Sequence, residues 1–203
     1  QVEPFLEMIE KVWVDTYTAE VGQQTLRSYI PKQILLVGSA SYNDDGSTTE
    51  GTAEGGRQIV LYSVNDFNFE LEQIQSYAHV MHHEFAHILH QNVEYDAEFE
   101  KITPSYSSSW MQMNDETARS KGFSTAYASS SADEDFAEMV SIMLTNSPED
   151  WDNMIENAGN AAAVEALRKK EAIVVAYMKN NWGVNMKDFQ KEVVAAIEAA
   201  GRN

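Results

Sequence analysis

All five histidines of the 203-residue chain lie within twelve positions, in the stretch HVMHHEFAHILH from His79 to His90. Within it, His83, Glu84 and His87 form the pattern H-E-x-x-H. Two histidines four residues apart on a helix lie one turn apart on the same face, so both rings can reach one metal ion. A carboxylate directly after the first histidine can contact a water on that ion. The pattern predicts a metal site with His83 and His87 as ligands.

The helix that must position this pair is expected to run from about Phe69 to Gln91, after plausible caps at Asn65 and Asp66. Its apolar residues recur three and four apart, as on a buried helical face. They are Leu71, Ile74, Ala78, Met81, Phe85 and Ile88. The histidine pair points roughly 170° away from this stripe. We therefore expect the pair to face solvent, a cleft or another layer, which disfavours the alternative of two hydrogen-bonded core histidines.

The other three histidines are expected to be incidental or to support the ligands from outside. His79 lies eight residues from His87, and His90 lies seven from His83, which is a rise of about 10–12 Å along a helix. One tetrahedral ion with bonds near 2 Å cannot readily gather ligands over that span. His82 is likewise expected to be incidental or to support the ligands from outside.

A hydrolytic zinc site takes three protein ligands and keeps one position open. The chain has no cysteine, so the third ligand is expected to be a carboxylate. The favoured candidate is Glu134 in the segment ADEDFAEMV, one helical turn before Glu138. One of these acids can bind the metal while the other accepts a hydrogen bond from a ligand histidine. Asp135 and Glu138 remain alternative ligands.

A competing interpretation of Glu134 is purely structural. Residues 131–134 (Ser-Ala-Asp-Glu) fit a capping box, in which the glutamate side chain would return to the helix start. Acidic residues in a first turn also suit the helix dipole. Read by itself, the segment does not decide between ligand and cap.

The remaining elements predict an α+β fold that is mostly helical, with a small sheet in the N-terminal half. Residues 32–42 and 57–64 are short and rich in branched side chains, as strands are. The polar, glycine-rich residues 43–56 between them are expected to be a loop or hairpin connection. Residues 92–131 are interpreted as loops with one short helix. Helical patterns cover 3–22, 133–145, 147–158, 163–181 and 186–200.

Bulk composition narrows the function further. The length favours a single domain over residues 1–203. With 32 acidic against 14 basic residues, the formal net charge is −18, which makes nucleic acid an improbable partner. The absence of cysteine excludes disulfides and thiolate chemistry. The start QVEPFLEM, without an initiator methionine, predicts trimming of a precursor whose signal peptide or lipid-bearing cysteine would lie upstream.

The segments HHEFAHILHQ and EDFAEM resemble the gluzincin metallopeptidases, and most closely the substrate import-associated zinc metallohydrolases. These are lipoproteins found beside bacterial outer-membrane nutrient importers. A more distant likeness is to the catalytic domain of anthrax lethal factor, in which a tyrosine lies seven residues before the glutamate ligand, as Tyr127 does before Glu134 here. The likeness covers about residues 57–144.

This resemblance implies a zincin-like fold and a residue-by-residue assignment of the site. His83, His87 and Glu134 become Zn²⁺ ligands, with Glu84 as the general base. Glu138 becomes the hydrogen-bond partner of a ligand, and Tyr127 a donor to the developing oxyanion.

The function expected from these features is zinc-dependent hydrolysis of peptide or protein substrates. The strand at 57–64 is expected to offer an edge to an extended peptide. The resemblance also implies an extracytoplasmic protein that is lipid-anchored to the outer membrane and associated with a nutrient-import complex. One alternative is a non-catalytic binding module that serves such an importer. Another is a structural helical protein in which the motif is accidental.

Overall fold

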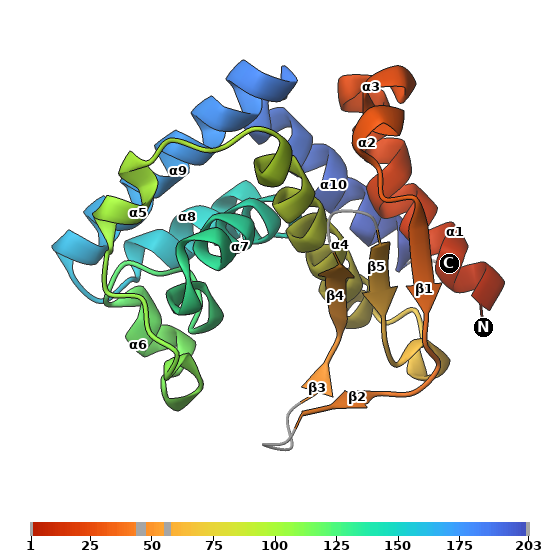
Figure 1. Cartoon of the computed structure of the whole chain (residues 1–203), viewed down its shortest axis with the longest axis horizontal. Helices are drawn as coiled ribbons and strands as arrows, with labels where there is room; N and C mark the ends of the chain where they lie inside the picture. The colour runs from red at the N-terminus through yellow and green to blue at the C-terminus, as the bar shows by residue number, and fades with distance from the viewer. Residues whose placement is uncertain (1, 44–47, 55–57, 202–203) are drawn as a thin grey trace.

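The structure, a computed structural model, describes residues 2–43, 48–54 and 58–201, with the side chains at 53 and 54 outside this description. It confirms an α+β fold that is mostly helical, with a small mixed sheet near the N-terminus (Figure 1). The N-terminal helices are α1 (Val2–Ile9), a π-helical segment (Glu10–Val14), α2 (Asp15–Val21) and α3 (Gln23–Tyr29). The strands are β1 (Gln33–Leu36), β2 (Ser41–Tyr42), β3 (Thr48–Thr49), β4 (Gly51–Glu54) and β5 (Gln58–Leu61). The later helices are α4 (Leu71–Asn92), α5 (Glu98–Ile102), α6 (Asp115–Arg119), α7 (Ala132–Thr145), α8 (Pro148–Glu156), α9 (Ala161–Trp182) and α10 (Met186–Ala200).

The three-stranded sheet has the order β1-β5-β4, with β1 parallel and β4 antiparallel to β5. Because β5 is central, the expectation that residues 57–64 offer a free edge is wrong. The edge strand on the helical side is β4, which comes from the segment expected to be a loop or hairpin connection and pairs antiparallel with β5. Residues 44–47 and 55–57 of the expected loop and strand lie outside the described residues.

The strand β4 lies close to α4 because Gly51 has no side chain. A Cβ at position 51 would collide with Val80 of α4 and lie 3.1 Å from the Val60 carbonyl oxygen. Any larger residue would push the strand away from the helix. The edge of the sheet is thereby held against the helix that carries the histidines.

The helix α4 occupies the centre of the molecule, between the sheet and α7 (Figure 1). The predicted stripe is buried from Ile74 to Ile88, at 2% exposure or less, but Leu71 is 49% exposed. Leu71 begins the helix, where the core does not reach it. Asn65 and Asp66 are not its caps, because they lie in a 3-10 turn (Val64–Asp66) and the helix is preceded by Glu70.

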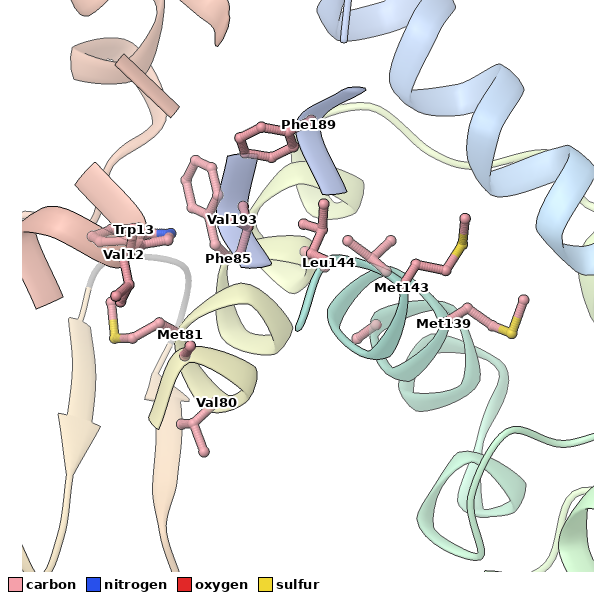
Figure 2. Close-up of a cluster of buried hydrophobic side chains, with 14 of the residues drawn as sticks. Val12, Trp13, Val80, Met81, Phe85, Met139, Met143, Leu144, Phe189 and Val193 are labelled. Atoms are coloured by element: carbon pink, nitrogen blue, oxygen red, sulfur yellow. The ribbon is translucent and has the colours of Figure 1, made fainter. Parts of the chain in front are cut away.

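Aromatic and aliphatic side chains from distant segments meet on the apolar face of α4 (Figure 2). The ring centroid of Phe85 lies 5.3 Å from Trp13 and 4.8 Å from Tyr17, and both pairs are edge-on. Phe189 of α10 packs on Tyr17 at 4.7 Å. Such pairs contribute about 0.5–1.5 kcal/mol each beyond their buried area. They fix the rotation of α4 about its axis.

Local signals account for the later helices. Ser147 accepts a hydrogen bond from the Asp150 N–H with Pro148 at the first helical position of α8, as the pattern predicts. The helix α10 occupies the residues 186–200 expected from sequence. The segment 92–131 contains two short α-helices, α5 and α6, where one was expected.

A buried ion pair ties α7 to α9. Lys170 and Asp135 are both 0% exposed, and the Lys170 Nζ donates to Asp135 Oδ2 and, at 2.8 Å, to the Gly122 carbonyl oxygen. Tyr106 also donates to Asp135 Oδ2, at 3.0 Å. The Asp135 carboxylate therefore lies between α9 and the segment that precedes α7.

We expect Lys170→Met to lower the free energy of unfolding by about 3–5 kcal/mol, because it leaves a buried carboxylate without its partner. Urea denaturation measures the loss. The matched control is Lys169→Met, since Lys169 is the adjacent lysine but its side chain is 61% exposed; its effect should stay within about 0.5 kcal/mol. Equal stability of the two variants would contradict a structural role for the pair.

Candidate metal centre and active-site cleft

The candidate metal centre forms where the first turn of α7 crosses the middle of α4. The Nε2 atoms of His83 and His87 lie 3.1 Å apart. The Glu134 Oε2 atom lies 3.0 Å from His83 Nε2 and 3.2 Å from His87 Nε2. Three atoms from residues up to 51 positions apart thus form a nearly equilateral triangle.

This triangle fits a zinc ion. Tetrahedral zinc with bonds of about 2.0–2.1 Å holds its ligand atoms about 3.3 Å apart, close to the three observed separations. Two imidazole nitrogens and one carboxylate oxygen are also a donor set that catalytic zinc uses. His83, His87 and Glu134 therefore have the geometry and the chemistry of metal ligands.

The backbone and the side chain of Glu134 distinguish its two interpretations, as a helix cap and as a metal ligand. Its backbone N–H donates to the Ser131 side chain at 3.2 Å, so Ser131 does cap α7. Its carboxylate does not return to the helix start but points at the histidines. The alternative ligand Asp135 points away toward Lys170.

Glu138 lies behind His83, one turn further along α7. Its Oε1 atom lies 2.9 Å from His83 Nδ1, an ion-pair distance at which the N–H is not ideally aligned for a hydrogen bond. The same oxygen is hydrogen-bonded to His79 Nε2 at 2.9 Å, and Thr125 donates to Oε2 at 2.7 Å. These contacts hold an almost fully buried carboxylate against the second nitrogen of His83.

The charges at the site are mutually stabilised. Burial raises the pKa of Glu134, but its close contacts with His83 and His87 outweigh burial and hold that pKa well below the usual range. For Glu138, His79 and His83 likewise outweigh burial and lower the pKa. Burial lowers the pKa of His83, but the two glutamates raise it to about 10. Without a metal ion, the two glutamates thus favour the protonated form of His83.

A second group of possible metal donors overlaps the first. His79, His83 and Glu138 also place one ligand atom each within 4.8 Å of one another. This group would use His83 Nδ1, which faces Glu138, whereas the first uses Nε2. Only the first group contains both histidines of the H-E-x-x-H pattern and the acid favoured from sequence.

A cleft runs along α4 past this centre. One cavity of about 620 Å³ and a second of about 540 Å³ share their central residues. These shared residues are Thr49, Gly51, His83, Glu84 and Tyr127. The segment from β3 to β4 forms one wall, α4 forms the floor, and the loop and 3-10 turn before α7 form the opposite wall. An extended ligand in this cleft would cross the three converging atoms.

The two residues expected to take part in chemistry lie in this cleft. Glu84 is 9% exposed and lines both cavities beside His83. Tyr127 is 37% exposed, lies in the 3-10 turn Tyr127–Ser130, and has its ring centroid 5.9 Å from that of His83. Burial and the nearby Glu134 raise the pKa of Tyr127, so its hydroxyl keeps its proton and can donate.

Two of the remaining histidines, which the sequence left as either incidental or supporting, contact the residues of the site. His79 bonds Glu138, and His90 Nε2 lies 2.9 Å from His87 Nδ1. Helical spacing was the available signal, since His79 precedes His83 by four residues and His90 follows His87 by three. His82 differs, because it is fully buried against Tyr17 and Phe189, and burial lowers its pKa to about 3.

None of the helices in the described part of the chain has the length and apolar character needed to cross a bilayer.

Comparison with known proteins identifies the family. The model of a family described as "putative zinc-binding metallo-peptidase" matches residues 1–187. A crystal structure of a "putative zinc-binding metallo-peptidase" from Bacteroides caccae superposes with a TM-score of 0.85. It shares 33% sequence identity, over 98% of this chain and 77% of that one. No curated protein sequence matches the chain. The chain thus belongs to the family of putative zinc-binding metallo-peptidases.

Proposed function

We propose that this protein is a zinc-dependent peptidase in which His83, His87 and Glu134 hold the ion and Glu84 is the general base. The observation that carries the proposal is the convergence of three donor atoms, 3.0–3.2 Å apart, beside a buried glutamate in a cleft. Membership of a zinc-binding metallo-peptidase family supports it.

When bound, zinc would lower the pKa of a water and polarise the substrate carbonyl. The residues of this chain transfer protons, donate a hydrogen bond to the substrate and hold the ligand rings in place. Glu84 accepts the proton of the attacking water on its carboxylate and passes it to the leaving nitrogen. The hydroxyl of Tyr127 donates a hydrogen bond to the carbonyl oxygen as negative charge develops there. Glu138 holds the His83 ring in place.

The proposed substrate is an extended peptide. β4 is the edge strand beside the cleft, and an extended chain can add to such an edge through main-chain hydrogen bonds. Trp110 and Met111 line the larger cavity and give it an apolar wall for substrate side chains.

The test of the proposal is Glu84→Gln. We expect kcat/KM to fall by about 10²–10⁴, because general-base catalysis contributes about that much, while bound zinc stays at the wild-type level. Cleavage of a broad peptide library followed by mass spectrometry measures activity, and elemental analysis measures zinc.

The matched control is Glu72→Gln, an exposed glutamate in the first turn of the same helix, which should leave both readouts unchanged. Full activity of Glu84→Gln would remove Glu84 as the base. A zinc-loaded wild type that cleaves nothing in the library would favour a binding module instead.

We expect Glu134→Gln to weaken zinc binding by more than the 10–100-fold that loss of an outer partner typically costs, because it removes an anionic ligand atom. Competition with a chromogenic chelator measures the dissociation constant. Glu149→Gln is the control, since Glu149 is an exposed acid in the first turn of α8. If both variants bind zinc equally well, another acid completes the site.

Zinc binding near pH 7 should release about one proton, because His83 is protonated below a pKa of about 10 in the metal-free site and must be neutral to bind. The depressed pKa of Glu134 means that this carboxylate contributes none. Affinity should therefore rise with pH up to about 10. Calorimetry in two buffers of different ionisation enthalpy counts the protons, and identical heats in both buffers would contradict the assignment.

A further inference from the structure

His90 is not placed to bind the same ion as His83 and His87. Its Nε2 atom lies 2.9 Å from Nδ1 of His87, whereas the Nε2 atom of His87 faces His83 and Glu134. His90 thus contacts the side of the His87 ring that points away from the metal centre.

The contact constrains where the protons lie. A neutral imidazole carries one N–H and one lone pair. If His87 presents its Nε2 lone pair to a metal, its proton is on Nδ1 and must be donated to an acceptor. The atom of His90 that faces His87 Nδ1 is Nε2, so His90 accepts there with its own proton on Nδ1. Both rings are then neutral, each in a single tautomer.

The two proposed ligand histidines have different partners. Behind His83 lies the Glu138 carboxylate, which is charged and contacts His83 Nδ1 at 2.9 Å. Behind His87 lies the imidazole of His90, which is neutral when it accepts the hydrogen bond from His87 Nδ1. An outer partner of either kind fixes the tautomer and orientation of a ligand ring.

Packing keeps the His90 ring in position. His90 is 7% exposed, and its ring meets Tyr95 edge-on at 5.5 Å and Phe136 at 6.0 Å. Tyr95 and Phe136 are stacked on each other at 4.4 Å. Tyr95 is in turn held by its hydrogen bond to Asp133 at 2.7 Å. A ring held on two sides is already oriented before any metal binds.

We propose that His90 is a positioning residue that holds His87 in the tautomer with its proton on Nδ1, so that Nε2 is free to bind zinc. The inference rests on the metal-binding part of the proposed function and not on catalysis.

The experiment compares His90→Phe with His90→Gln. Phenylalanine keeps an aromatic ring against Tyr95 and Phe136 but has no acceptor, whereas the glutamine amide oxygen can accept from His87 Nδ1. We expect His90→Phe to weaken zinc binding by about 10–100-fold and His90→Gln to recover most of that loss. Chelator competition measures zinc affinity.

A second readout reports the tautomer directly. In zinc-loaded, ¹⁵N-histidine-labelled protein, His87 should show one protonated Nδ1 and one metal-bound Nε2 in the wild type and in His90→Gln. In His90→Phe the Nδ1–H signal should lose the shift of a hydrogen-bonded proton. Thermal unfolding of the metal-free variants separates these effects from loss of fold. His82→Phe, the same replacement at a histidine in the core, should leave zinc affinity unchanged.

The possible outcomes are distinct. Wild-type zinc affinity in His90→Phe would overturn the role of His90. Equal weakening by Phe and Gln would also overturn it, because the acceptor would then not matter. A wild-type protein that binds no zinc would overturn the metal centre and this inference together. A wild type that binds zinc but cleaves no peptide would overturn only the proposed peptidase activity.

Discussion

The constraint on which the site depends is the meeting of three electron-pair donors at one point. Two imidazole nitrogens and a carboxylate oxygen lie within 3.2 Å of one another, which is stable only with a proton or a cation among them. Without a metal ion, the raised pKa of His83 favours a proton on that ring. The Ser131 cap and the buried Lys170–Asp135 pair fix α7, and therefore Glu134, at that point.

The centre is buried because each histidine has a partner for its second nitrogen. Unpaired polar groups in a protein interior cost free energy, so these partners reduce the cost of burying the two proposed ligand histidines. Glu138 contacts Nδ1 of His83, and His90 contacts Nδ1 of His87. Apart from His82, which packs on Tyr17 and Phe189, the helix is apolar toward the aromatic core and polar toward α7.

The sheet contributes to the site through its edge. Gly51 lets β4 approach Val80 closely, which makes the strand a wall of the cleft beside Glu84 and Tyr127. The central strand β5 is paired on both sides and has no edge to offer. Register and order within the sheet therefore decide which segment can meet an extended ligand.

The sequence by itself determined the features that depend on neighbours along the chain. The helical spacing of His83 and His87, the capped start of α8 and the α+β class follow from short-range periodicity and capping. Only the tertiary structure decided what depends on distant contacts. It turned Glu134 toward the histidines and Asp135 toward Lys170, although the two are adjacent in sequence. It placed β4 in a segment with loop-like composition, because pairing with β5 compensates for weak local preference. The directions of Glu134 and Asp135 depend on contacts with residues 47 and 35 positions away in the chain, which a local pattern does not specify.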